Sequence, residues 1–256
     1  MQRTGIEYLD YTFNPIAMRC TPVSAGCKNC WHLRMATRLA GNDCFARDRQ
    51  RAYHGDGPPL LLEDELTAPL RLRKPGVIGV QFMGDLFHDA VPFKMVDSVI
   101  GIAAQCQRHT FVVLTKRTRR ALAWLAWRST FTNQTDLPRN VIFGTSIENQ
   151  PTADERIPLL LEVPAARRMV SIEPMLGPVD LWYAAFDGSE SRPLGKLPGI
   201  DWAALGAETG PKKRRMDLDW ARSVRDQCLD AGVPFFFKQD SDGSHELDGL
   251  TWTQRP

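Results

Sequence analysis

Three cysteines lie close together near the start of the chain, in the segment Cys20-Thr-Pro-Val-Ser-Ala-Gly-Cys27-Lys-Asn-Cys30. The C-x2-C pair places two thiolates on one tight turn, and Cys20 can close over the same metal. Three thiolates suit a [4Fe–4S] cluster that keeps one iron open for an exogenous ligand. They also suit zinc, which needs a fourth ligand in a closed structural site; His32 and Cys44 are the candidates. We therefore expect a metal centre at this segment.

The other cysteines carry less information. Cys106 and Cys228 fall on apolar helical faces, where a small buried core residue is the expected role. Six cysteines among 256 residues are too few for a disulfide scaffold. The clustering of three of them therefore favours metal binding.

Polar residues follow nearly every strand-like apolar segment of the sequence. If the strands are parallel, these residues meet at the edge where α/β barrels build active sites. Polar strand ends are also ordinary loop starts, but repetition over six strands favours a shared pocket. The residues are Gly84, Asp85, Lys116, Arg117, Ser146, Glu148, Asn149, Glu173, Glu208 and Lys238.

The segments that must position these residues alternate between strand and helix patterns. We predict strands at residues 11–13, 77–83, 110–114, 140–144, 168–172, 200–205 and 234–237. We predict helices at residues 31–39, 93–106, 117–127, 152–161 and 217–231. Continuously apolar strands separated by helices indicate a parallel sheet with covered faces. Six or seven such units fit a partial (β/α) barrel better than an open sheet.

Domain organisation and location follow from composition. We expect a single α/β domain over residues 1–256, with insertions or lids at 41–76 and 175–199. A hydrophobic content of 43%, a charged content of 24% and a net charge of +2 neither favour nor exclude nucleic acid. No apolar stretch approaches the roughly 18 residues of a membrane span, and the N-terminus lacks the apolar core of a signal peptide. We expect a cytoplasmic protein, in the host cell if it is phage-encoded, with reduced thiols.

With these residues in place, the chain resembles the phage-associated proteins grouped as domain of unknown function 5131, which are themselves similar to radical S-adenosylmethionine (SAM) enzymes. The resemblance runs nearly end to end. One departure is the loop spacing: radical SAM enzymes usually have C-x3-C-x2-C with an aromatic residue before the last cysteine. Here the first gap holds six residues, and Trp31 follows the last cysteine. The blocks that carry the resemblance include residues 6–15, 20–30, 83–88, 114–117, 144–149, 156–160, 171–174, 176–180, 206–211 and 231–239.

The resemblance implies a cofactor and a mechanism. Cys20, Cys27 and Cys30 would hold a [4Fe–4S] cluster whose open iron chelates the methionine part of SAM. One electron, from a donor such as flavodoxin or ferredoxin, would cleave SAM to methionine and a 5′-deoxyadenosyl radical that abstracts hydrogen from substrate. The enzyme class within this chemistry stays open.

The resemblance also implies roles for the residues at the strand ends, each with a structural ion pair as the competing interpretation. Gly84 and Asp85 match the motif that contacts the methionine amino group. Ser146, Glu148 and Asn149 match positions that bind the SAM ribose or carboxylate. Lys116 or Arg117 would pair with a carboxylate or phosphate, and Glu173, Glu208 and Lys238 would serve the substrate as catalytic residues.

Phage association suggests a modified base in DNA, or a nucleotide, as substrate. Basic residues at 116–120 and 212–215 can meet phosphates, and Trp124, Trp127, Trp182 and Trp252 can stack on bases. Basic helix starts and core aromatic residues explain the same features equally well. An alternative function is a zinc-stabilised nucleic-acid-binding protein without catalysis. A third interpretation, a barrel hydrolase with Asp85, His88 and the glutamates on a divalent metal, leaves the three cysteines without a role.

Overall fold

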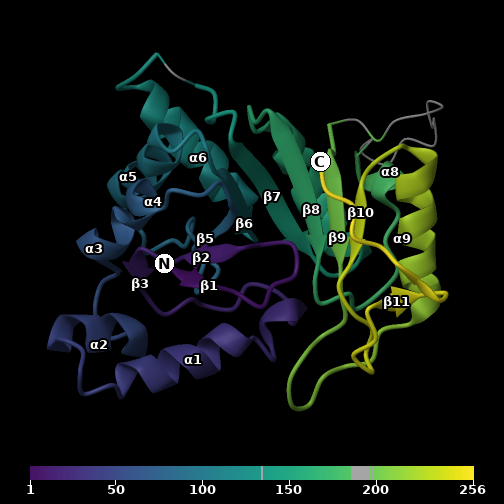
Figure 1. Ribbon diagram of the computed structural model, residues 1–256, viewed down its shortest axis with the longest axis horizontal. Coiled ribbons are helices and arrows are strands. Elements are labelled where there is room, and N and C mark those ends of the chain that lie inside the picture. Colours follow the sequence, from purple (N-terminus) through teal and green to yellow (C-terminus); the bar gives the residue numbers. More distant parts are fainter. Residues whose placement is uncertain (134, 186–196, 198) are drawn as a thin grey trace. The chain divides into compact units, whose positions relative to one another are not determined.

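The computed structural model describes residues 1–133, 135–185, 197 and 199–256 (Figure 1). Its contacts divide the chain into two compact units. The first unit consists of Met1–Val23 and Cys30–Ile142, and the second of Ser24–Asn29 and Phe143–Pro256. The cysteine segment is therefore shared: Cys20 and Cys30 belong to the first unit, whereas Cys27 belongs to the second.

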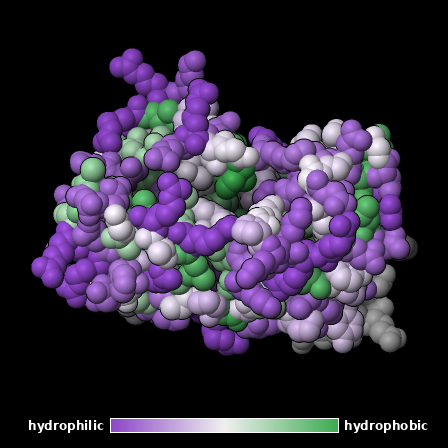
Figure 2. Space-filling view, turned by 90° about the horizontal axis from the view of Figure 1, so that it is seen from below, coloured by the Kyte–Doolittle hydropathy of each residue, from purple (hydrophilic) through white to green (hydrophobic). Residues whose placement is uncertain are grey.

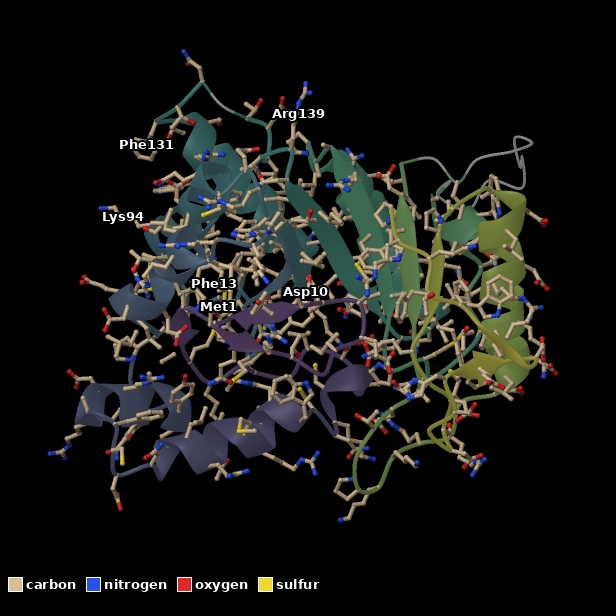
Figure 3. The ribbon with its side chains drawn as sticks, viewed as in Figure 1. Met1, Asp10, Phe13, Lys94, Phe131 and Arg139 are labelled. Carbon is tan, nitrogen blue, oxygen red and sulfur yellow. The ribbon has the colours of Figure 1, made fainter. Side chains whose placement is uncertain are left out.

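The strands of the first unit are mostly parallel. Strand β2 (Tyr11–Phe13) pairs in parallel with β5 (Val77–Val80), which pairs in parallel with β6 (Thr110–Thr115). The two-residue strand β1 (Gln2–Arg3) adds to β2 in antiparallel orientation. Phe13, labelled in Figure 3, is fully buried in β2. Helices α5 (Phe93–Gln105) and α6 (Thr118–Ser129) follow β5 and β6 and bury their apolar faces.

A second, small hydrophobic core in this unit lies between the two helices that follow the cysteine segment. Helices α1 (Trp31–Ala40) and α2 (Arg47–His54) pack together beside the antiparallel pair β3 (Ile16–Ala17) and β4 (Leu60–Leu61). Buried Ala36 of α1 and Tyr53 of α2 belong to one hydrophobic cluster. Short helices α3 (Glu63–Leu66) and α4 (Ala68–Arg71) follow. Residues 41–76, expected as an insertion or lid, thus contribute α2, β4, α3 and α4 to the first unit.

The second unit repeats the alternation of strand and helix. Its strands follow the order β7 (Val141–Ile147), β8 (Arg167–Ile172), β9 (Trp202–Leu205) and β10 (Phe235–Phe237). The last three are parallel. The helices are α7 (Gln150–Glu162), α8 (Leu181–Ala185) and α9 (Leu218–Asp230), and the hairpin β11 (Glu246–Leu247) with β12 (Leu250–Thr251) lies near the C-terminus. Part of the expected insertion at 175–199, namely residues 186–196 and 198, lies outside the described residues.

The predicted fold class is confirmed at the level of a mixed α/β protein with mostly parallel strands and helices between them. One strand ends three residues earlier than predicted. The strand expected at 77–83 ends at Val80, because Gln81 has φ of 54° and leaves the extended region. The amide of Gln81 donates to the carbonyl of Ile16 at 2.8 Å and accepts from its N–H at 3.1 Å. None of the helices in the described part of the chain is long and apolar enough to cross a membrane.

Candidate functional site

Asp85 is the centre of a buried polar cluster in the first unit. It follows β5, and its Oδ1 accepts hydrogen bonds from Thr115 Oγ1 at 2.7 Å and from the backbone N–H of Phe87 at 2.9 Å. Arg117 Nη1 donates to Asp85 Oδ2 at 3.1 Å, and the two side chains are 7% and 6% exposed. Burial lowers the pKa of Arg117, but Asp85 and Cys20 more than reverse this and raise it above its usual value. The structure therefore brings together the ends of β5 and β6, as predicted.

Arg117 and His32 hold the backbone that carries Cys20. Arg117 Nη2 donates to the carbonyl oxygen of Thr21 at 2.9 Å, and its Nη1 lies 3.8 Å from Cys20 Sγ. His32 Nε2 accepts a hydrogen bond from the Cys20 N–H at 3.1 Å. These contacts fix the first cysteine of the segment through a buried cation and a buried imidazole.

Burial shifts both buried histidines of this cluster toward the neutral form. Burial, followed by Arg19, lowers the pKa of His32 to about 4, and burial followed by Arg117 lowers the pKa of His88. Since His32 Nε2 accepts a hydrogen bond, its ring proton is assigned to Nδ1. His88 Nδ1 accepts from the Ala90 N–H at 3.1 Å, and His88 Nε2 accepts from the Thr21 N–H at 3.3 Å and lies 2.8 Å from Thr21 Oγ1. The Nε2 atom of each ring is thus engaged by the backbone N–H of Cys20 or of Thr21.

Glu148 anchors the middle of the cysteine segment in the second unit. It follows β7, its side chain is 0% exposed, and its Oε1 accepts a hydrogen bond from Ser24 Oγ at 2.6 Å. Arg156 of α7 lies 3.4 Å from the other oxygen of Glu148 and provides the compensating charge. Gly26 packs against the same carboxylate, and a β-carbon built on Gly26 would lie 2.5 Å from Oε1. The turn Ala25–Cys27 is thus seated on a buried ion pair.

Glu208, after β9, holds the other end of this turn. Its Oε2 accepts hydrogen bonds from Asn29 Nδ2 at 2.9 Å, and from the backbone N–H and Nε of Arg214 at 2.8 and 2.9 Å. Arg214 Nη2 also donates to Glu208 Oε1, and to the carbonyl oxygen of Ala25 at 3.0 Å. The hydrogen bonds from Arg214 hold the pKa of Glu208 at about 2. Glu208 is therefore an ionised, fully engaged carboxylate at neutral pH.

Glu173 and Lys238 form a second charged pair in this unit. Glu173 follows β8 and Lys238 follows β10, and Lys238 Nζ donates to Glu173 Oε1. Their side chains are 27% and 12% exposed, so the pair is partly open to solvent. The structure brings these two predicted residues together, whereas Glu208 is engaged by Arg214.

The remaining predicted residues have distinct surroundings. Asn149 is the N-cap of α7, where its Oδ1 accepts the Thr152 N–H at 3.3 Å in a capping box. Ser146 is half-buried, and its carbonyl oxygen accepts Arg156 Nη1 at 2.7 Å. Gly84 has φ of 135°, a conformation that favours glycine, and Lys116 is half-buried. The roles in SAM binding assigned to these residues stay predictions.

None of the three candidate ligands forms a disulfide with a residue that the structure describes. Cys20, Cys27 and Cys30 are all partly exposed, whereas Cys106 and Cys228 are buried and Cys44 is exposed. Burial raises the pKa of Cys228 to about 12, which fits the predicted core role. Within the described ranges, no three side chains of His, Cys, Asp or Glu stand in an arrangement that could hold a metal ion. The candidate centre therefore rests on the type, spacing and accessibility of the thiols.

Several residues that fix this segment were not predicted from the sequence. They are Ser24, Gly26, Asn29, Arg156 and Arg214, which hold the Cys27 turn, together with His32, considered only as a zinc ligand. The polar residues directly beside the cysteines were the available signal. Arg214 stood out only as part of the basic cluster at 212–215, and Arg156 gave no signal, because helices commonly carry arginine.

Some of the basic residues and tryptophans considered for nucleic acid are engaged within the protein. Arg117 is buried against Asp85, and Arg120 donates to the carbonyl oxygens of His88 and Val91. In the second cluster, Arg214 binds Glu208 and Arg215 pairs with Asp242. Two of the four tryptophans are buried in the core, namely Trp124 and Trp182.

The comparisons with known proteins give one family. The pattern of a family described as "Protein of unknown function (DUF5131)" matches residues 3–255, which is nearly the whole chain. No curated protein and no solved structure matches this chain.

Proposed function

Because the chain belongs to the DUF5131 family, whose resemblance to radical SAM enzymes includes a three-cysteine loop, we propose that it is a radical SAM enzyme. Its [4Fe–4S] cluster is held by Cys20, Cys27 and Cys30, and its substrate is a base in nucleic acid. One observation supports this most strongly. The three partly exposed cysteines lie on a segment that hydrogen bonds from Arg117 and Arg214, and to Glu148, hold in place. The expected partial barrel of six or seven parallel strands is part of the same proposal.

The donor set fits such a cluster. Three thiolates leave one iron open, as the chemistry requires. A closed zinc site needs a fourth ligand. His32 Nε2 already accepts the Cys20 N–H, and Cys44 lies on the loop between α1 and α2. When bound, the cluster would supply the electron that cleaves SAM and yields the 5′-deoxyadenosyl radical; the electron comes from a donor such as flavodoxin or ferredoxin.

The residues of the first unit then have two proposed roles, which are to position Arg117 and to contact SAM. The carboxylate of Asp85 orients Arg117 and the start of α6, since its oxygens are occupied by Thr115, Arg117 and backbone N–H groups. We assign contact with the methionine amino group to the backbone of Gly84. The left-handed conformation there lets a ligand approach the main chain closely. Lys116, beside it, is the candidate partner of the SAM carboxylate.

In the second unit, Glu148 and Glu208 are positioning residues for the Cys27 turn. Both carboxylates already accept two or more hydrogen bonds from protein groups. Ser146 remains the candidate for the SAM ribose. The partly exposed pair of Glu173 and Lys238 can hold or move a proton at a substrate atom, so we assign it to the substrate side.

Anaerobic purification followed by iron, sulfide and zinc analysis tests the proposal. We expect about four irons per chain in the wild type, and loss of iron in a triple C20A/C27A/C30A variant. The exposed Cys44→Ala serves as the matched control and retains its iron. Reduction with dithionite in the presence of SAM then yields 5′-deoxyadenosine.

Zinc in place of iron, even after anaerobic reconstitution, contradicts the proposal. It favours instead the zinc-stabilised nucleic-acid-binding protein. If the protein contains iron but forms no 5′-deoxyadenosine under reducing conditions with SAM bound, the iron–sulfur cluster is supported and the radical chemistry is contradicted.

A further inference from the structure

Helix α1 presents an aromatic and cationic stripe directly after the last candidate ligand. Its first residue is Trp31, which follows Cys30, the N-cap of the helix. Trp31, Arg34 and Arg38 are spaced i, i+3 and i+7, so they share one face of the helix. All three are exposed, Trp31 by 43%, whereas His32 and Ala36 on the opposite face are buried.

The arginines of this stripe have no acidic partner. The guanidinium groups of Arg34 and Arg38 make no hydrogen bond or ion pair with any residue that the structure describes. They differ in this from Arg117, Arg156 and Arg214, whose charges are matched by carboxylates. Unmatched, exposed guanidinium groups in a row are suited to a polyanion.

Helix α2 extends the positive surface. Its exposed Arg47 lies one turn from Arg51, which pairs with Asp56, and α2 packs against α1 in the first unit (Figure 1). Residues 30–54 carry arginines at five positions and aspartates at only two, Asp43 and Asp48. Figure 2, drawn from the side on which α1 and α2 lie in Figure 1, shows this part of the first unit as mostly hydrophilic.

We propose that the exposed face of α1, formed by Trp31, Arg34 and Arg38 and continued by Arg47 of α2, binds a nucleic-acid strand with an unpaired base. The arginines contact successive phosphates, and Trp31 stacks on a base. Trp31 and Arg38 are seven residues apart, so they are separated by about 10 Å along the helix axis, the length of roughly three nucleotides in one strand. Stacking on an exposed indole requires a base outside a duplex, which favours a single-stranded or locally opened substrate.

This inference rests on the proposed function for its chemistry, because it places the nucleic-acid strand on helix α1, whose N-cap is the candidate ligand Cys30. Binding itself does not require a cluster. It is measured on the purified full-length protein with and without iron, so that failure of one proposal leaves the other testable.

Fluorescence anisotropy with a short labelled single-stranded oligodeoxynucleotide, and with RNA of the same sequence, tests the surface and distinguishes the two strands. We expect affinity to fall steeply between about 50 and 200 mM salt. Replacing Arg34 and Arg38 together by glutamine reduces the slope of log K against log salt by about 1.4. Trp31→Ala weakens binding about 5- to 150-fold, whereas Trp31→Phe retains most of the affinity.

Two matched controls lie elsewhere in the first unit. Arg139 is exposed and makes no ion pair with the described residues, and Phe131 is 72% exposed; both are labelled in Figure 3. Arg139→Gln and Phe131→Ala should bind like the wild type. Circular dichroism and thermal unfolding establish that each variant is folded.

Three outcomes overturn the inference. The first is no binding at low salt. The second is equal weakening by the α1 substitutions and by the controls. The third is binding to heparin or to anionic vesicles that is as tight as binding to the oligonucleotide and is unchanged in Trp31→Ala. That result indicates a surface for polyanions in general or for membranes.

Discussion

Gly26 lies against the carboxylate of Glu148 with no room for a side chain: a β-carbon built on Gly26 would be 2.5 Å from Glu148 Oε1 and 2.6 Å from its Cγ. The Glu148 side chain has little freedom to move away from such a β-carbon, because it is fully buried and bonded to Ser24 and Arg156. The turn that carries Cys27 is therefore seated on Glu148 through direct contact.

Replacing Gly26 with alanine should loosen this turn. We expect a loss of about 1–3 kcal/mol in the free energy of unfolding, the usual cost of overpacking, and reduced iron content. Urea unfolding and iron analysis measure the two effects. Gly101→Ala is the control, because Gly101 lies within α5 with open space around it and should be neutral or stabilising. Wild-type stability and iron in Gly26→Ala would refute the role of this contact.

Glu208 should make stability depend on pH in the acidic range. Arg214 holds the folded-state pKa of Glu208 at about 2, compared with 4.5 for an ordinary glutamate. The carboxylate therefore stabilises the fold fully above about pH 5, by at most about 3 kcal/mol, and this contribution is lost as the pH falls toward 2. Comparing urea unfolding of Glu208→Gln with the wild type from pH 7 to pH 2.5 measures it. A difference between the two proteins that stays constant over this range contradicts the assignment.

Replacing Asp85 with asparagine should be more costly than replacing its neighbour Asp89. Asp85→Asn leaves the buried guanidinium of Arg117 with only the exposed Asp89 as a charged partner, and breaking a buried pair costs about 3–5 kcal/mol. Asp89 is 75% exposed, so Asp89→Asn should change stability by less than about 1 kcal/mol. Chemical denaturation of both variants tests the comparison, and equal effects would show that Asp85 is not the main counter-charge.

Asn149 offers a test of two competing roles. As the N-cap of α7, its loss in Asn149→Ala should cost about 1 kcal/mol, and Asn149→Asp should restore stability because aspartate caps equally well. As a SAM contact, its loss should instead weaken SAM binding. Thermal unfolding together with SAM titration of the reconstituted protein separates the two. Unchanged stability with weakened SAM binding would contradict the capping role.

The sequence by itself determined the features that depend on local pattern. The spacing of Cys20, Cys27 and Cys30 is a property of the chain alone. Apolar runs bounded by polar residues predicted strands such as β6 and β8, and the period of apolar residues predicted helix α5, because neighbouring side chains alternate or recur on one face. The helix predicted to begin at residue 217 also forms, and Asp217 caps it by accepting the Asp219 N–H at the start of α9.

Only the tertiary structure decided which groups meet. Ser24 and Glu148 are separated by 124 residues, and Asn29 and Glu208 by 179, yet each pair forms a hydrogen bond. No local pattern encodes such partners, because the strand ends that supply the carboxylates are brought to the turn by the packing of the sheet. The same packing buried Arg117 against Asp85, although the sequence equally allowed it to meet a phosphate. It left Arg34 and Arg38 exposed, because the opposite face of α1 packs into the small hydrophobic cluster of the first unit.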